Sequence, residues 1–419
     1  MGGSQGTGPK PAQQLTGIRV LDLTNVLSGP YAAYQMALLG AEVIKVENPR
    51  EGDLARKLGA STALNQALMG TSFLAQNAGK KSVTIDLKHP EGKALFADLV
   101  ATADVLIENF RPGVMDRLGF GYAAVRAINP AIVYCAISGF GQAGPLSANP
   151  AYDQIVQGMS GVMSITGDAQ SAPLRVGYPL CDTLGGMGAA FAIVSALLVR
   201  MKTGEGTFID LSMLDATISA MGWAVSNYLI AGVEAKPFGN QNTTAAPSGA
   251  FTCADGQINI AANKQEQFEK LCELVGRPEL ITDPRFAERE ARKANRAAIN
   301  AEINAALLAR PAIEWEELLN ANGVPAGRIL SVPEVLAHPQ IRARGLIQEL
   351  PVGQPGLETV KVVRAGFCFG DSQPDARTAP PLLGADNAEI FGALGRDAAG
   401  LETLRAKGAD RKSTRLNSS

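Results

Sequence analysis

The sequence of 419 residues has only two histidines, His89 and His338. Each precedes a proline, so we predict that both lie in loops and outside any catalytic cluster. The five cysteines are scattered, without the paired spacing of a zinc site or a disulfide framework. A metal site and most histidine-based acid–base schemes are therefore not predicted, and this use of cysteine fits a reducing cytoplasm.

The sequence also lacks an excess of charge of either sign, because 38 basic side chains stand against 40 acidic ones. The net charge of -2 gives no basic surface for a nucleic acid, and such a partner is not predicted. No N-terminal stretch has the apolar centre of a signal peptide. One apolar run, Leu184–Met201, is short for a membrane span and contains glycines, so we predict a buried helix and no membrane partner.

Short β-branched runs alternate with helical segments through the first 140 residues. Strands are expected at 18–23, 42–47, 80–87, 104–110, 132–138 and, further on, 207–212. This alternation predicts an α/β fold with a parallel sheet. The loop after the first strand falls where such sheets bind ligands, but it holds the single glycine Gly29 in place of a G-x-G-x-x-G pattern, so NAD is not predicted.

The domain organisation follows from a shift in composition near Lys236, where a polar loop begins. We predict a flexible tail at 1–14 and the N-terminal part of a large α/β domain at 15–235. A small α+β domain is expected at 236–330, and the C-terminal part of the large domain at 331–410. Residues 411–419 have no apolar periodicity and are interpreted as an artefact or a disordered tail.

The main functional candidate is Asp182, which joins a polar segment to the apolar helix. Aspartate is a favoured N-cap, so Asp182 would by one interpretation only cap that helix. However, Gly185, Gly186 and Gly188 each cost the helix roughly 1 kcal/mol relative to alanine. A chain accepts this cost where something approaches its backbone closely, and a carboxylate beside such a space suits a nucleophile. The local sequence leaves both interpretations open.

Four cations, Lys80, Lys81, Arg111 and Arg117, lie near predicted strand ends. Any single one of them is expected to be solvated surface. Together they would suit a ligand that carries phosphate groups.

Six ordered motifs extend this picture over nearly the whole chain. They are Gly17–Thr24, Gly40–Glu47, Asp86–Gly92, Glu108–Gly113, Lys202–Gly206 and Pro381–Gly384. In this order they resemble the family III CoA-transferases, which include formyl-CoA transferase and carnitine CoA-transferase. The resemblance implies a Rossmann-like large domain built from both termini, a small domain between them, and an interlocked, ring-like homodimer.

The resemblance also implies site residues, with Asp182 as the catalytic nucleophile and CoA, brought by an acyl-CoA substrate, in place of any resident cofactor or metal. The positions implied to contact CoA are Asn25, Val26, Leu27, Ser28, Ile85, Asn109, Phe110, Val114, Arg117 and Leu118. Asn25 and Leu27 replace the His and Gln of formyl-CoA transferase, so their contacts would be backbone or hydrophobic ones.

The implied reaction moves CoA from an acyl-CoA to a carboxylic acid by covalent catalysis, through an aspartyl anhydride and an aspartyl-CoA thioester. A small dicarboxylyl-CoA such as succinyl-CoA is the expected donor, and Arg175 would meet its distal carboxylate unless it is a surface residue. Gly239–Asn242 stands where formyl-CoA transferase has a polyglycine loop, so oxalate/formate specificity is not implied.

Two alternative functions remain at this level. The 2-methylacyl-CoA racemases of the same family place a Gly-His-Asp motif about thirty residues before the aspartate, whereas this chain has Ala151, Tyr152 and Asp153. Loss of the histidine removes one proton-transfer partner, which favours a transferase over a racemase or isomerase. Asp153 would then cap a helix or act near the site. A non-catalytic CoA-binding protein with this fold is the alternative from another class.

Overall fold

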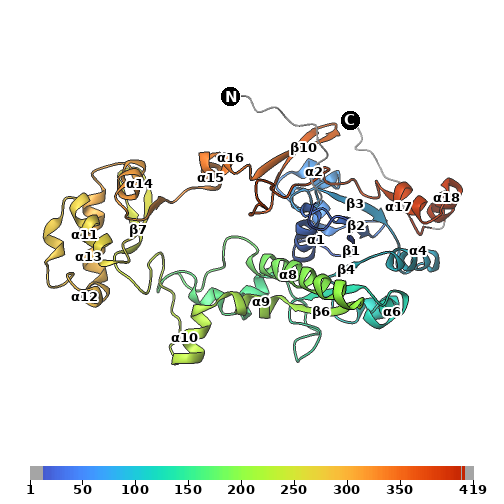
Figure 1. Ribbon diagram of the computed structural model, residues 1–419, viewed down its shortest axis with the longest axis horizontal. Helices are drawn as coiled ribbons and strands as arrows, with labels where there is room; N and C mark the ends of the chain where they lie inside the picture. The colour runs from blue at the N-terminus through green and yellow to red at the C-terminus, as the bar shows by residue number, and fades with distance from the viewer. Residues whose placement is uncertain (1–12, 407, 411–419) are drawn as a thin grey trace. The chain divides into compact units, whose positions relative to one another are not determined.

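The first unit of the chain is built on a six-stranded parallel sheet (Figure 1). The computed structural model describes residues 13–406 and 408–410. The strands are β1 Arg19–Asp22, β2 Glu42–Glu47, β3 Lys80–Thr84, β4 Val105–Glu108, β5 Val133–Ser138 and β6 Thr207–Ser212. Their order is β3-β2-β1-β4-β5-β6, so the direction of winding reverses between β1 and β4. The predicted α/β fold with a parallel sheet is confirmed, and this reversal is the place where such sheets bind ligands.

Both faces of the sheet are covered, because its strand residues are apolar on both sides. Leu21, Ile44 and Leu106 face one core with α4 and α6, whereas Val20, Val43 and Val105 face the other core with α1 and α8. The helices of this unit are α1 Ser28–Leu38, α2 Thr62–Gln66, α3 Thr71–Leu74, α4 Pro90–Ala101, α5 Val114–Leu118, α6 Tyr122–Ile128, α7 Asp153–Met159, α8 Leu180–Thr203, α9 Met213–Ala220, α17 Asn387–Ala393 and α18 Ala398–Ala406, with a 3₁₀ turn η1 at Leu54–Lys57.

Helix α8 differs from its prediction in two ways. It begins at Leu180 with Pro179 as N-cap, so Asp182 lies inside the first turn and is not the cap. One face is buried against the rest of the unit, but the other is exposed, with Phe191 77% and Met201 81% accessible. The predicted burial therefore holds for one face of α8 only. Among the described residues, only α8 has the length and apolar composition of a membrane span, which core helices share.

The glycines of α8 serve helix packing. A Cβ on Gly185 would lie 2.9 Å from Ser28 Oγ, and one on Gly186 would lie 2.5 Å from the Ser28 carbonyl oxygen. Any larger residue would therefore push α8 away from the start of α1. The close approach predicted from these glycines is real, but the group that approaches is the chain's own helix and not a ligand.

The C-terminal segments complete the first unit. Strands β10 Ile347–Gln354 and β11 Leu357–Val363 form an antiparallel hairpin whose apolar side chains pack against Tyr34 and Leu38 of α1. Beyond it, Asp386 Oδ2 accepts a hydrogen bond from Ser82 N at 2.7 Å, and Asn387 Oδ1 accepts one from Thr84 N at 2.9 Å. These bonds cover the free edge of β3, which would otherwise expose unpaired backbone groups.

The second unit consists of Met163–Arg175 and Asn227–Arg342, whereas the small domain was predicted over 236–330. It holds the antiparallel strands β7 Ser248–Thr252, β8 Gln257–Ala261 and β9 Ala326–Arg328, and the helices α11 Gln265–Leu274, α12 Arg289–Ala294, α13 Arg296–Leu307, α14 Ala312–Ala321 and α15 Val332–Ala337. Phe268, Ile303 and Trp315 lie in its separate core.

One predicted helix is wrong. The amphipathic pattern over 215–230 predicted a continuous helix, but the chain forms α9 and then α10 Trp223–Ala231. Gly222 separates them with a φ of +43°, which interrupts the helical backbone.

Candidate functional site

The candidate site lies at the carboxyl ends of β1 and β4, where the sheet reverses its direction. The loop after β1 and the loop after β4 are held together by one side chain. Asn109 Oδ1 accepts a hydrogen bond from Asn25 N at 2.8 Å, and its Nδ2 donates one to the Asn25 carbonyl oxygen at 2.9 Å. Two cavities lie at this junction, and Asn25 and Phe110 line both of them.

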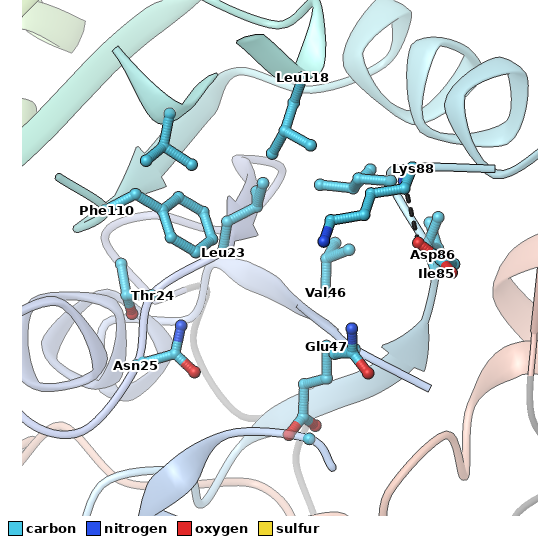
Figure 2. A pocket seen from close by; sticks show the side chains of 14 residues that line it. Leu23, Thr24, Asn25, Val46, Glu47, Ile85, Asp86, Lys88, Phe110 and Leu118 are labelled. Carbon is cyan, nitrogen blue, oxygen red and sulfur yellow. Dashed lines mark hydrogen bonds between the residues drawn. The ribbon is translucent and has the colours of Figure 1, made fainter. Parts of the chain in front are cut away.

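The first cavity, of about 260 Å³, is a mainly apolar slot between strand ends. Its lining is Leu23, Thr24, Asn25, Val46, Glu47, Asn48, Gly52, Ile85, Asp86, Leu87, Lys88, Phe110, Val114 and Leu118. Figure 2 shows the Phe110 ring beside Leu23 and the Lys88 side chain extending over the slot. A flat apolar group would fit between such walls, with a cation available to an anion at the opening.

The second cavity, of about 390 Å³, contains Asp182. Its lining is Asn25, Val26, Leu27, Ser28, Leu54, Asn109, Phe110, Arg111, Pro112, Ile137, Ser138, Gly139, Ser147, Asn149, Pro150, Ala151, Tyr152, Asp182 and Met213. Ser28 begins α1, whose first N–H groups have no intrahelical acceptor. The cavity thus places a carboxylate in the same space as the positive end of a helix.

Asp182 does not cap the helix on which it lies, because another residue accepts hydrogen bonds from the first N–H groups of that helix. Asp153 Oδ1 accepts hydrogen bonds from Cys181 N at 2.8 Å and Asp182 N at 3.4 Å. Asp153 is buried, and Gln157 Nε2 donates a hydrogen bond to its other oxygen at 2.7 Å. Within residues 13–406 and 408–410, the Asp182 carboxylate itself accepts no hydrogen bond. Asp153 therefore binds the first-turn N–H groups of α8, whose N-cap residue is Pro179, and this places it near Asp182.

The environment of Asp182 disfavours its charged form. Burial raises the pKa of its carboxyl from 3.8 to about 7, and the nearby Asp153 carboxylate adds to the rise. Once ionised, a carboxylate that is poorly solvated and has no hydrogen-bond donors is more basic and more nucleophilic than an exposed one, although a smaller fraction of it is ionised at neutral pH. This environment differs from that of a helix cap, whose carboxylate accepts N–H groups.

A pH-dependent stability follows for Asp182→Asn. The unfolded carboxyl ionises near pH 4, but the folded one holds its proton to about pH 7. The free energy of unfolding of the wild type therefore falls as the pH rises from about 4 to about 7. Above about pH 7 the full cost of burying the ionised carboxylate is present, and this contribution falls no further. We expect the melting temperature of Asp182→Asn to exceed that of the wild type at about pH 8 and to equal it at about pH 4. Equal melting temperatures across this range would contradict the unfavourable environment of the carboxylate.

Nine of the ten residues implied to contact CoA line one or both cavities. The exception is Arg117, which is exposed and lines neither cavity. Arg111 lines the second cavity, but Lys80 and Lys81 begin β3 at the opposite end of the sheet. Lys80 is buried against Asp22, and Lys81 pairs with two glutamates. The prediction that four cations together bind phosphate groups is therefore wrong for Lys80 and Lys81.

Lys88 is the cation that the sequence analysis missed. It follows β3 at its carboxyl end and forms part of the Asp86–Gly92 motif, so its position after the strand could have singled it out. In the part of the chain that the structure describes, no cluster of three or more His, Cys, Asp or Glu side chains is arranged to hold a metal ion.

The fold and the site together define an α/β protein with two cavities at the reversal point of its sheet and, in one of them, a carboxyl group with a raised pKa. The family model described as CoA-transferase family III matches residues 15–387. The chain therefore belongs to CoA-transferase family III, as predicted, and is an enzyme that transfers CoA.

Individual relatives agree with this assignment. An acetyl-CoA:oxalate CoA-transferase of Acetobacter aceti is 40% identical over 386 residues, which are 92% of this chain and 96% of the relative. A succinate–glutarate CoA-transferase of Agrobacterium fabrum is 39% identical over 394 residues, 92% of this chain and 97% of the relative. The crystal structure of a CAIB/BAIF family protein from Brucella suis gives a TM-score of 0.81 at 36% identity, covering 91% of this chain and 100% of that one.

Proposed function

We propose that this CoA-transferase carries its acyl group and then its CoA on Asp182. One observation supports the proposal above all. Asp182 is a carboxylate with a raised pKa and no hydrogen-bond donor of its own, in a cavity that shares Asn25 and Phe110 with an apolar slot. A long substrate with a flat group at one end and a reactive carbonyl at the other would span the two cavities.

The first half-reaction loads CoA onto the enzyme. An Asp182 oxygen attacks the thioester carbonyl of the donor, the C–S bond breaks, and CoA leaves as a thiolate, which gives an acyl-aspartyl anhydride. The thiolate then attacks the Asp182 carbonyl of the anhydride and releases the donor acid as a carboxylate. The product is an aspartyl-CoA thioester, and no proton or metal is needed in either step.

The second half-reaction reverses these steps with another acid. The acceptor carboxylate attacks the aspartyl-CoA thioester and expels the thiolate, and the thiolate then attacks the acceptor carbonyl of the new anhydride. This forms the new acyl-CoA and regenerates the Asp182 carboxylate. Each step passes through an oxyanion, and we propose that backbone N–H groups at the start of α1, where Ser28 and its N-cap residue Leu27 line the cavity, donate to it.

The donor and acceptor are proposed from chemistry and from the relatives. Arg111 and the polar groups Ser138, Ser147 and Asn149 line the cavity beside Asp182, which suits a small acyl group with a second polar end. The relatives are named for acetyl-CoA and oxalate and for succinate and glutarate. We propose a small dicarboxylic acid on at least one side of the exchange, with succinyl-CoA as the first donor to assay.

A homodimer in the cytoplasm completes the proposal. The exposed face of α8 carries large apolar side chains, among them Phe191, Leu198 and Met201. Apolar surface of this kind marks a contact with another protein, and we propose a second copy of the chain. The five cysteines form no disulfide, which fits a reducing compartment.

Lys88 is expected to contribute to CoA binding through a phosphate group. We expect Lys88→Met to weaken the binding of CoA about 3- to 10-fold, and to reduce the dependence of that binding on salt, because one exposed cation is lost. Isothermal titration of CoA at two salt concentrations measures both effects. Lys81→Met is the matched control, since Lys81 lies at the other end of β3 and should leave the affinity for CoA unchanged. Equal losses in the two variants would contradict this placement.

A transfer assay tests the function. The purified enzyme is incubated with each of several acyl-CoAs and a panel of mono- and dicarboxylic acids, and new acyl-CoA is quantified by liquid chromatography. Formation of the acceptor's CoA ester, with loss of the donor in equal amount, is the expected result. The alternative racemase function predicts exchange of the α-proton with deuterated solvent and no new CoA ester. The exposed Tyr152 that lines the cavity argues against it, because a phenol is a poor base near neutral pH.

A further inference from the structure

The loop between β1 and α1 contains a strained residue at the wall of the Asp182 cavity. Val26 has a φ of +67°, in the left-handed region that β-branched residues rarely occupy. Such a conformation persists only where surrounding contacts hold it, and it is typical of functional sites. Val26 and its neighbours Leu27 and Ser28 line the cavity, so the conformation of Val26 sets the direction in which α1 begins.

A buried carboxylate holds Val26 in this conformation. Asp53 Oδ1 accepts a hydrogen bond from Val26 N at 2.9 Å, and the same oxygen accepts one from Ala55 N at 2.8 Å. Asp53 is only 1% exposed. Hydrogen bonds to charged acceptors are shorter and stronger than those to neutral acceptors. The bond from Val26 N to the Asp53 carboxylate is therefore suited to hold Val26 at its unfavourable positive φ.

Asp53 is in turn fixed by a buried charge cluster, which consists of Asp22, Lys45, Asp53 and Lys80. Lys45 Nζ lies 2.9 Å from Asp53 Oδ2, and Lys80 Nζ lies 2.9 Å from Asp22 Oδ2. All four side chains are inaccessible to solvent, and their two positive and two negative charges balance. Burying an unpaired carboxylate is costly, and these ion pairs offset that cost.

The lysines of the buried charge cluster also bind the loop itself. Lys45 Nζ donates a hydrogen bond to the Thr24 carbonyl oxygen at 2.7 Å, and Lys80 Nζ donates one to the Pro30 carbonyl oxygen at 3.0 Å. The start of the loop and the first turn of α1 are thus held by lysines, and Val26 between them is held by Asp53. Because Asn109 fixes Asn25 separately, loss of Asp53 would release mainly the part of the loop from Val26 to the start of α1.

We propose that Asp53 is a positioning residue for CoA transfer. It acts through the Val26 N–H group, and it keeps the start of α1, with its unpaired N–H groups, turned toward the carbonyl that Asp182 attacks. This role rests on the function proposed above. Asp53 touches neither the substrate nor Asp182, and its effect on the reaction passes entirely through the backbone of Val26.

A rescue experiment tests this role. We expect Asp53→Ala to lower kcat about 10-fold or more and to raise the KM for acyl-CoA about 3- to 10-fold, because Val26 relaxes from its left-handed conformation. Adding Val26→Gly should restore at least about 3-fold in kcat/KM, since glycine adopts a positive φ at no steric cost. Asp53→Asn keeps one acceptor oxygen and should fall between Asp53→Ala and the wild type.

A structural control separates positioning from stability. Asp104 accepts a hydrogen bond from Arg19 N at 2.7 Å and pairs with Arg200, at the amino ends of the strands. We expect Asp104→Ala to lower the melting temperature but to leave kcat/KM unchanged. Kinetics are measured well below each variant's melting temperature. Asp53→Ala with kcat/KM within about 2-fold of the wild type, or no restoration by Val26→Gly, would overturn the proposal.

The same variants remain informative if Asp53→Ala does not fold or if the proposed function fails. If Asp53→Ala does not fold, Asp53→Asn replaces it. Asp53→Asn should then lower kcat/KM, and adding Val26→Gly should restore part of it. No loss in Asp53→Asn, or no restoration by Val26→Gly, would overturn the proposal. In the second case no acyl-CoA would give CoA transfer with the wild type, and the affinity for CoA then serves as the readout. Asp53→Ala should weaken CoA binding about 5-fold and Val26→Gly should recover it; unchanged affinity in both would count against the role of Asp53.

Discussion

Asp182→Asn is expected to abolish CoA transfer while CoA still binds. The amide oxygen has no full negative charge and cannot attack a thioester, so the rate should fall at least about 10³-fold. The side chains that line the first cavity are untouched, and the dissociation constant for CoA should stay within about 3-fold of the wild type. Steady-state transfer assays and calorimetric titration of CoA measure the two effects on the same preparations.

Asp215 provides the matched control for this substitution. Like Asp182, it is the third residue of a helix, and Ser212 Oγ, the N-cap side chain of α9, accepts a hydrogen bond from its N–H group. However, Asp215 is exposed and lines neither cavity. Asp215→Asn should therefore keep full activity. Retention of more than about a tenth of the activity by Asp182→Asn would show that Asp182 is not the nucleophile.

Arg56→Met is expected to destabilise the first unit by about 3–5 kcal/mol, because it leaves the Glu47 carboxylate buried without its partner. The guanidinium Nε lies 2.7 Å from Glu47 Oε2, and one of its terminal nitrogens lies 2.7 Å from Oε1. It also lies 3.7 Å from the centre of the Phe73 ring and donates to the Pro381 carbonyl oxygen. The pair thus ties β2 to the C-terminal part of the chain, and its member Glu47 also lines the first cavity.

Urea unfolding followed by circular dichroism measures this loss. Trp315 lies in the core of the second unit, so its fluorescence provides an internal reference that should not shift. The double variant Glu47→Gln/Arg56→Met removes both charges and should recover much of the lost stability, since no unpaired charge stays buried. A loss below about 1 kcal/mol in Arg56→Met, or a double variant as unstable as the single one, would contradict the account of this pair.

Most of the sheet could be predicted from local sequence. The runs at 42–47 and 207–212 are the observed β2 and β6, because β-branched residues there are bounded by turns. The break between α9 and α10 was missed, since the apolar pattern continues through Gly222. Periodicity reports which residues face a core, but it does not report a single backbone angle that stops a helix.

The site was predicted less completely, because its decisive contacts join distant parts of the chain. Local sequence could not separate a capping Asp182 from a reactive one, since the residue that accepts the first-turn N–H groups of α8 is Asp153, far upstream. Likewise, the family resemblance pointed to Val26 but not to Asp53, which reaches it from a separate turn. Lys80 begins β3 and Lys88 follows its carboxyl end, so the rule that parallel sheets bind ligands at their carboxyl ends could have favoured Lys88 over Lys80.

The most direct measurement is the mass of the protein after brief incubation with an acyl-CoA, followed by hydroxylamine trapping and peptide mapping. The account predicts that hydroxylamine converts one carboxyl to a hydroxamate, on the peptide that contains Asp182, and only when an acyl-CoA is present. The acyl-CoA that gives this adduct identifies the donor. An adduct confined to another peptide, or turnover without any hydroxylamine-sensitive adduct, would contradict covalent catalysis by Asp182.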